Sequence, residues 1–179
     1  MKRWKLIGTE RVYHSKYMSL FNDRVILPND QIVTYTRVEL KDFVTVLPTT
    51  ENKIVMIEIF RYPANRLSLE IPSGYVENGE DPRECAIREL EEETGYKAGK
   101  LRSLGWFQPW TRSVRRAHLF FAEDLTKGIQ RPDETEQIEV KLLSIEEVRK
   151  KLETDEITHA PTIIALQKYL LMRLDCIRR

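Results

Sequence analysis

The 179-residue sequence is poor in cysteine, in histidine and in net charge. Its two cysteines, Cys85 and Cys176, are too few and too far apart in sequence to suggest a disulfide framework or a zinc site, and we interpret both as small core or surface residues. The 29 basic residues nearly balance the 28 acidic ones. Such a balance does not indicate a nucleic-acid-binding surface, so no nucleic-acid partner is expected.

Long apolar runs are also missing. No stretch approaches the roughly 20 residues of a membrane span, and the first residues, Met1 to Lys5, are not followed by the apolar segment of a secretion signal. We therefore expect a cytoplasmic protein with no membrane partner. His118 has no second ligand beside it in sequence, and we interpret it as structural. The length suits a single domain with a substantial core.

The most regular pattern lies between Gly74 and Tyr96 and reads GYVENGEDPRECAIRELEEETGY. Asp81, Pro82 and Glu84 match an N-cap, a proline at the first helical position and a capping-box glutamate. Gly95 is the permissive residue expected just after a helix end. The pattern predicts a helix from Pro82 of about 12 to 13 residues, an ordinary length.

Three glutamates crowd one side of this predicted helix. Glu89, Glu92 and Glu93 are spaced i, i+3 and i+4, which places their carboxylates together. Like charges at this spacing cost about 0.2 to 0.5 kcal/mol per pair in an isolated helix. A divalent cation with a preference for oxygen ligands, such as Mg²⁺ or Mn²⁺, would offset that repulsion. The alternative is an acidic helix face that is simply solvated.

The whole stretch resembles the Nudix box, G-x5-E-x7-R-E-U-x-E-E-x-G-U with U apolar, and only Tyr96 departs from it. The matched positions are Gly74, Glu80, Arg88, Glu89, Leu90, Glu92, Glu93 and Gly95. The resemblance implies a metal-dependent hydrolase that cuts a diphosphate joined to a second group, with Mg²⁺ as the cofactor and Mn²⁺ as the alternative. It also implies the metal ligands, which are the backbone carbonyl of Ser73 and the carboxylates of Glu89, Glu92 and Glu93.

Strand-like runs surround the box and helical patterns finish the chain, which favours an α/β fold, an α/β/α sandwich around a mixed sheet. This is also the Nudix fold that the resemblance implies. We expect one Nudix domain over residues 1–179, with N-terminal strands in 1–41 and the catalytic core in 42–179. The expected strands are 19–27, 31–40, 42–48, 53–60, 67–71, 101–107, 116–122 and 138–143, the first two forming a hairpin, and the expected C-terminal helices are 144–152 and 160–174.

The runs FRYP at 60–63 and LEIPSG at 69–74 resemble the entry to the box in ADP-ribose pyrophosphatases. That subfamily resemblance implies a homodimer in which the N-terminal strands cross to the partner. It also implies four substrate-binding residues. Trp4 and Tyr35 would stack on the base, the alternative being plain packing. Arg61 would meet the phosphates, the alternative being a surface salt bridge, and Glu70 stands in the same motif.

For the general base, the resemblance points to an acidic loop, with Glu136 as first choice and Glu134 in reserve; the alternative is a box glutamate such as Glu92. Arg88 is expected to orient the site by pairing with a carboxylate, either Glu80 or a ligand glutamate. One segment departs from the subfamily: the loop 108–113, QPWTRS, lacks its glycine and adds bulk and charge, which could remodel the pocket.

The sequence therefore predicts a Mg²⁺-dependent nucleoside diphosphate sugar hydrolase, with ADP-ribose, cut to AMP and ribose 5-phosphate, as the first substrate. The same chemistry on GDP-mannose, a UDP-sugar or a dinucleotide such as NADH or diadenosine polyphosphate is the nearest alternative. A Nudix-fold module that senses a nucleotide without cutting it is a second class. Such a module would be expected to lose a metal-binding glutamate, and none is missing here.

Overall fold

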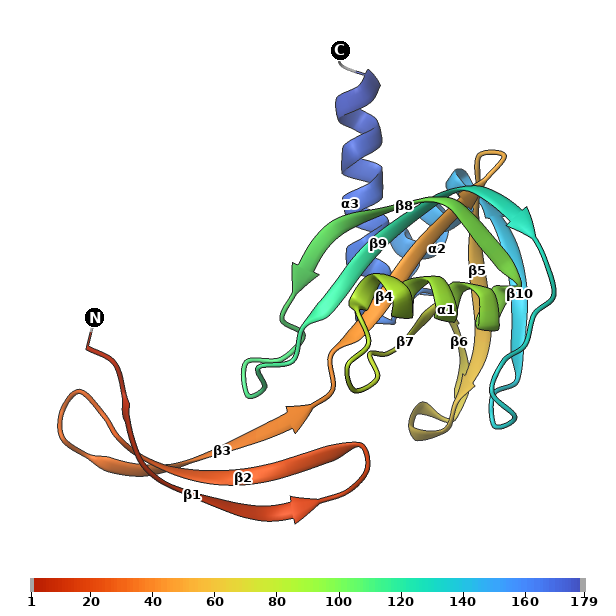
Figure 1. Cartoon of the computed structure of the whole chain (residues 1–179). Helices are drawn as coiled ribbons and strands as arrows, with labels where there is room; N and C mark the ends of the chain where they lie inside the picture. Colours follow the sequence, from red (N-terminus) through yellow and green to blue (C-terminus); the bar gives the residue numbers. More distant parts are fainter. Residues whose placement is uncertain (1, 178–179) are drawn as a thin grey trace. The chain divides into compact units, whose positions relative to one another are not determined.

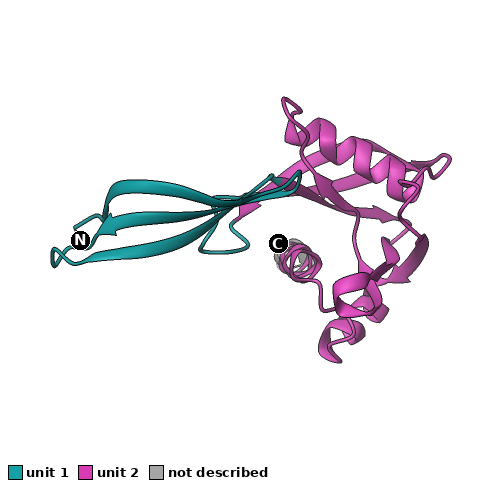
Figure 2. Cartoon of the chain, turned by 90° about the horizontal axis from the view of Figure 1, so that it is seen from below, with its two compact units in different colours: residues 1–42, 108–116 teal, residues 43–107, 117–179 magenta. Residues whose placement is uncertain are grey.

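The computed structural model describes residues 2–177, and side chains up to Arg173, so Cys176 lies outside the described side chains. The chain forms two compact units, residues 1–42 with 108–116 and residues 43–107 with 117–179 (Figure 2). The unit boundary at 42 lies beside the expected division at 41, whereas loop 108–116 groups with the N-terminal strands. The reading of the chain as one domain stays a prediction. Within residues 2–177, no helix has both the length and the apolar character that a membrane span needs.

The first unit is an antiparallel sheet of three strands in the order β1-β2-β3, with the loop 108–116 added. The expected hairpin is confirmed as β2 and β3, joined by a turn in which Asp30 has a φ of 66°. Aspartate tolerates this left-handed conformation, which suits the turn. The strands are β1 Lys5–His14, β2 Met18–Ile26 and β3 Ile32–Leu40.

The second unit is built on a seven-stranded mixed sheet, in which β4 and β9 run parallel and the other pairs run antiparallel (Figure 1). The main order is β10-β5-β4-β9-β8, with β6 on β5 and β7 on β4. The strands are β4 Phe43–Thr50, β5 Lys53–Arg61, β6 Arg66–Glu70, β7 Ser73–Tyr75, β8 Tyr96–Phe107, β9 Ala117–Lys127 and β10 Ile138–Ser144. The helices are α1 Pro82–Thr94, α2 Ile145–Glu153 and α3 Ala160–Ile177, and a short 3-10 helix spans Tyr62–Ala64.

Two cores fill the two faces of this sheet, because successive strand residues point to opposite sides. On β4, Val44 and Val46 pack with Ala86 and Leu90 of α1. Leu47 packs instead with residues of α2 and α3. Helices therefore cover both faces, and the predicted α/β/α sandwich around a mixed sheet is confirmed.

Local signals explain both ends of α1. The Asp81 side chain accepts a hydrogen bond from Arg83 N at 2.8 Å, and Pro82 occupies the first turn. Gly95 ends the helix with a φ of 74°, a left-handed conformation that glycine adopts without strain. Its N–H donates to Glu91 O at 2.8 Å. The helix predicted from Pro82 is thus confirmed, and it carries the box glutamates along the α1 face of the sheet.

Candidate active site

Arg88 lies at the centre of the charged side of α1. Its Nε and Nη2 donate to Glu80 at 2.9 and 3.1 Å, and its Nη1 donates to Glu89 at 2.6 Å and to Glu92 at 3.1 Å. The hydrogen bonds from Arg88 lower the pKa of Glu80 to about 2. The expected pairing of Arg88 with Glu80 and with ligand candidates is confirmed. One guanidinium therefore holds three carboxylates in fixed positions.

The Glu89 carboxylate lies directly against the backbone of Gly74. A Cβ atom at Gly74 would approach the Glu89 carboxyl carbon and Oε1 to 2.0 Å, so any side chain at this position would displace the carboxylate. Burial raises the pKa of Glu89, although the nearby Arg88 acts in the opposite direction. The first box glycine therefore leaves room for the Glu89 carboxylate, and its backbone angle does not by itself call for glycine.

Glu93 is buried at the end of α1, with 2% of its surface exposed. Its Oε2 accepts a hydrogen bond from Ser73 N at 2.9 Å, which joins α1 to β7. Burial raises the pKa of Glu93 well above its ordinary value, and the charges of Glu89 and Glu136 add to this effect. A single backbone donor and the more distant Arg61 do not offset these costs, so Glu93 is a buried acid without a sufficient cationic partner.

Arg61 and Glu70 form a two-point ion pair between β5 and β6. Arg61 Nε and Nη2 donate to Glu70 at 2.9 and 2.7 Å, and His159 Nδ1 lies 3.2 Å from Glu70 Oε2. Burial by itself raises the pKa of Glu70, but Arg61 and His159 outweigh it and the pKa lies below its ordinary value. The Arg61 side chain is 39% exposed whereas Glu70 is 1% exposed, so Arg61 is the member of the pair that faces outward.

The acidic loop before β10 is organised by Asp133, whose carbonyl accepts from Glu136 N at 2.9 Å. Burial raises the pKa of Glu136, Arg61 lowers it, and Asp133 and Glu92 raise it. Glu136 therefore lies within electrostatic range of both Arg61 and the carboxylates of α1. Glu134 is exposed. The choice of Glu136 as base, with Glu134 in reserve, stays a prediction.

The carboxylates of α1 suit a divalent cation by their chemistry, although among residues 2–177 no three acidic, imidazole or thiol groups are already arranged as a metal site. Arg88 holds Glu89 and Glu92, and Ser73 holds Glu93. The raised pKa values of Glu89 and Glu93 show that burial and mutual repulsion exceed this compensation. Hard oxygen donors that are short of positive charge are the ligands that Mg²⁺ and Mn²⁺ prefer, so the residues present fit such an ion.

Trp4 and Tyr35 belong to the N-terminal unit, where their rings lie 5.7 Å apart at 82°. The Arg112 guanidinium lies over Tyr35, 4.7 Å from the ring centre, and its Nη1 donates to Thr36 O at 2.9 Å. Nearly perpendicular rings do not form the parallel pair that would sandwich a base within this unit. Their role in base stacking stays a prediction. The loop 108–116, which departs from the subfamily pattern, contacts Tyr35 through Arg112.

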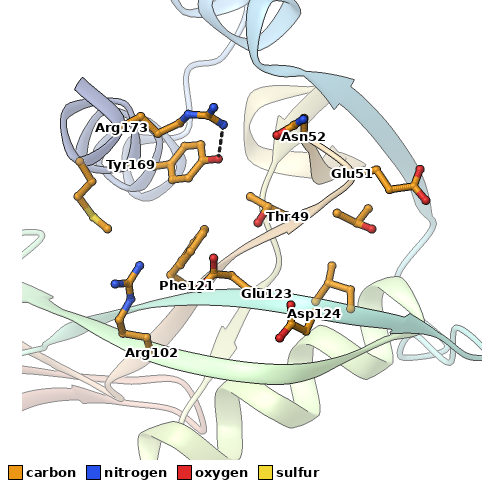
Figure 3. A pocket seen from close by; sticks show the side chains of 12 residues that line it. Thr49, Glu51, Asn52, Arg102, Phe121, Glu123, Asp124, Tyr169 and Arg173 are labelled. Atoms are coloured by element: carbon orange, nitrogen blue, oxygen red, sulfur yellow. Dashed lines mark hydrogen bonds between the residues drawn. The ribbon is translucent and has the colours of Figure 1, made fainter. Parts of the chain in front are cut away.

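A cavity of about 600 Å³ opens elsewhere in the second unit, between α3, the turn that joins β4 to β5, and the strands β8 and β9 (Figure 3). Arg102 lies over the ring of Phe121, and Arg173 over the ring of Tyr169. None of its lining residues comes from α1, β6 or β7. This cavity is therefore separate from the candidate active site.

Two polar residues near the Arg61–Glu70 pair, His159 and Thr162, were not indicated by the sequence pattern. Thr162 is fully buried, and its Oγ1 accepts from Ile71 N at 3.1 Å and lies 2.9 Å from His159 Nδ1. Both residues precede or open α3, far from the box in sequence. The local signal is Thr158-His159 just before Pro161, a pattern that ordinarily indicates the capped start of a helix.

The geometry agrees with comparison to known proteins. Residues 40–166 match the NUDIX domain family, and the chain belongs to that family and is a Nudix hydrolase. It is 37% identical to the ADP-ribose pyrophosphatase of Bacillus subtilis (strain 168) over 94% of this chain and 93% of the relative. It is 36% identical to the methanol dehydrogenase activator of Bacillus methanolicus over 91% and 90%.

The fold agrees with a solved structure as well. The crystal structure of an ADP compounds hydrolase superposes with a TM-score of 0.86 at 20% identity, over 96% of this chain and 95% of that one. At this identity the likeness establishes the Nudix fold alone.

Proposed function

We propose that this protein hydrolyses the diphosphate of ADP-ribose to AMP and ribose 5-phosphate with a divalent cation, Mg²⁺ being the first choice. One observation carries the proposal. The same unit contains two carboxylates whose charge is under-compensated, Glu89 and Glu93, and a partly exposed arginine, Arg61. The carboxylates suit a cation and the arginine suits diphosphate oxygens. The sugar nucleotide itself is supported by the name of the Bacillus subtilis relative.

The cation would be held by Glu89, Glu92, Glu93 and the Ser73 carbonyl. When bound, it supplies a lowered pKa for the attacking water and draws charge from the leaving phosphate. Arg88 keeps the first two carboxylates in position through its hydrogen bonds. Because those bonds already constrain the carboxylates, little reorganisation would accompany binding.

Arg61 would bind the diphosphate, with Glu70 holding its guanidinium from behind. Glu136 would accept the proton of the attacking water, and its raised pKa brings it closer to the range of a useful base. The acidic loop would carry this group toward bound substrate. The Glu136→Gln variant tests the role: a loss of more than about tenfold supports it, and a smaller loss favours a box glutamate such as Glu92.

We further propose a homodimer built through the N-terminal strands. Several large apolar side chains of β1 are exposed, among them Leu6 at 57% and Tyr13 at 52%. An apolar surface of this kind on a soluble domain usually marks an interface. Gel filtration with light scattering tests the dimer, and finding only monomer would remove both the crossed strands and base stacking by Trp4 and Tyr35 from two subunits. Cytoplasmic location stays a prediction.

The experiment that tests the function is a substrate panel of ADP-ribose, GDP-mannose, UDP-glucose, NADH and diadenosine polyphosphate, each with Mg²⁺ and with EDTA, read by chromatography. Two relatives of nearly equal identity carry different names, so the panel must span several diphosphates. Mg²⁺-dependent preference for ADP-ribose supports the proposal. Preference for another compound overturns the substrate but keeps the chemistry, and binding without turnover of any compound overturns the enzymatic assignment.

A further inference from the structure

A chain of polar contacts centred on the buried Glu70 runs from the start of α3 to the arginine of the candidate site. Glu70 receives Arg61 through both carboxylate oxygens, at 2.9 and 2.7 Å. His159 Nδ1 lies 3.2 Å from the oxygen that Arg61 Nη2 also contacts. Glu70 is 1% exposed, so protein groups and not water surround its carboxylate, and Ser68 also hydrogen-bonds to it. The carboxylate is thus fixed from both sides.

The proton on His159 can be placed from this geometry. Nδ1 lies close to two oxygens, 3.2 Å from Glu70 Oε2 and 2.9 Å from Thr162 Oγ1. A proton on Nδ1 suits both contacts, since a ring lone pair would be repelled by the Glu70 carboxylate. Burial lowers the pKa of His159 although Glu70 acts to raise it, so near neutral pH the ring is uncharged. We therefore assign the Nδ1–H tautomer, a neutral ring whose N–H faces both Glu70 and Thr162.

The same helix start also holds the backbone beside Glu70. Ile71 N donates to Thr162 Oγ1 at 3.1 Å, and Thr162 is fully buried. Ile163 N donates to His159 O at 3.0 Å, so the first turn of α3 is continuous with these contacts. Two neighbouring residues of the β6–β7 segment, Glu70 and Ile71, are thereby tied to α3.

We propose that His159 is a positioning residue for the hydrolytic reaction, acting through Glu70 to fix the guanidinium of Arg61 toward the substrate diphosphate. This inference rests on the proposed function, because it gives Arg61 a phosphate to bind. Arginine has five N–H donors, of which Glu70 accepts from two, and the Arg61 side chain is 39% exposed, so further donors can reach an anion. A guanidinium group that is already held in one orientation loses less conformational entropy when it binds an anion.

The test compares three variants at His159 and a control. His159→Ala removes the donor, His159→Leu keeps the bulk without it, and His159→Asn keeps an N–H the same number of bonds from the backbone as Nδ1. The control is Thr158→Ala, which removes only the bond between Thr158 Oγ1 and Arg66 Nη2 at 2.5 Å. Loss of one hydrogen bond to a charged group predicts a rise of about tenfold in KM for the Ala and Leu variants. Asparagine should restore KM, and the control should not change it.

A merely structural role predicts a different result: kcat would fall with the amount of folded enzyme while KM stayed constant. Unchanged KM in His159→Ala, or no rescue by asparagine, overturns the proposal. In an Arg61→Ala background, His159→Ala should add no further loss, since the two act on one contact. An additive loss also overturns it.

The inference and the proposed function fail in distinguishable ways. If the wild-type protein does not turn over ADP-ribose, the proposed function fails, and the variants are read on the best substrate of the panel. Independently of any substrate, ¹⁵N NMR of the His159 ring in the full chain should report the Nδ1–H tautomer, and Glu70→Gln should shift its resonances. An Nε2–H tautomer in the wild-type protein removes the donor and overturns the inference.

Discussion

Glu70 and Glu93 are two glutamates buried to nearly the same degree, at 1% and 2% exposure, yet their pKa values move in opposite directions. Glu70 has an arginine and an imidazole against its oxygens, and its charge is stabilised. Glu93 has one backbone N–H together with the repulsion of Glu89 and Glu136. Burial costs both groups, and only the partners decide the sign.

The comparison indicates that buried carboxylates serve two different purposes in this protein. A compensated carboxylate such as Glu70 is complete as folded and serves to hold another side chain. An under-compensated one such as Glu93 is stable only as an acid or with a cation. The charged side of α1 therefore has the electrostatics of a binding site, and the Arg61–Glu70 pair has those of a support.

The largest effect is expected for Glu93→Gln. Replacing this ligand candidate should lower kcat/KM by at least about a hundredfold, since even outer-shell partners of metals contribute 10 to 100-fold. The fold should remain, because the variant removes a buried charge. Glu91→Gln is the control, as the Glu91 side chain is 38% exposed and lies 3.5 Å from Lys97 Nζ. Steady-state kinetics with matched circular dichroism measure both. Near-normal turnover in Glu93→Gln would contradict the metal assignment.

Mg²⁺ should raise the melting temperature of the wild-type protein. A ligand that binds only the native state stabilises it by about 2.7 kcal/mol at a concentration of 100 times Kd. The shift should be absent or much reduced in Glu93→Gln and retained in Glu91→Gln. Thermal unfolding monitored by fluorescence with Mg²⁺ or with EDTA checks this. An equal shift in both variants would show that the cation binds elsewhere.

Glu70→Gln should destabilise the protein where Glu93→Gln does not. Breaking a buried pair costs about 3 to 5 kcal/mol, and because the Arg61 side chain is 39% exposed we expect a smaller loss, about 2 kcal/mol. Urea unfolding measures the difference. Glu58→Gln is the control on β5, since Glu58 is partly exposed and lies 3.6 Å from Lys141. Equal stability of the Glu70 variant and the wild type would refute the supporting role.

The Glu70 contribution should also depend on pH in one direction. Its folded-state pKa is below the ordinary value of 4.5, so the stabilisation is complete above that pH and disappears as the pH falls through the folded-state pKa. Because Glu70 also raises the pKa of His159, the gap is measured in a His159→Leu background, with and without Glu70→Gln. It should be constant from neutral pH to about 4.5 and then shrink. Urea midpoints at a series of pH values test it, and a gap that widens in acid would reverse the sign.

The smallest effect is expected away from both carboxylates, at the capping box of α2. Ser144 Oγ accepts from Glu147 N at 3.2 Å while Glu147 Oε2 accepts from Ser144 N at 2.7 Å. Ser144→Ala should cost about 1 kcal/mol of stability and leave kcat/KM unchanged. A change in turnover would mean that general destabilisation contributes to the losses measured for the other variants.

Sequence patterns predicted the elements of this fold well where the signals were local. The bounds of α1 follow from Asp81, Pro82 and Gly95, and the hairpin of β2 and β3 follows from its turn residues. The grouping of loop 108–116 with the N-terminal strands was not predictable, because it depends on contacts such as that of Arg112 with Thr36, 76 positions apart. The site was predicted as a set of residue types, without their burial and, apart from the pairing of Arg88 with carboxylates, without their partners.

The sequence by itself determined the helix and the spacing of its glutamates, because capping and periodicity act over three or four residues. The spaced pattern of the same stretch also indicated the family. Only the tertiary structure decided which carboxylate is compensated. Glu89 is pressed against Gly74, Glu93 is buried beside Ser73, and Ile71 is bonded to Thr162, 91 positions away. Burial and ion pairing arise between distant segments, and the cost of a buried charge depends on the partners that the fold brings to it.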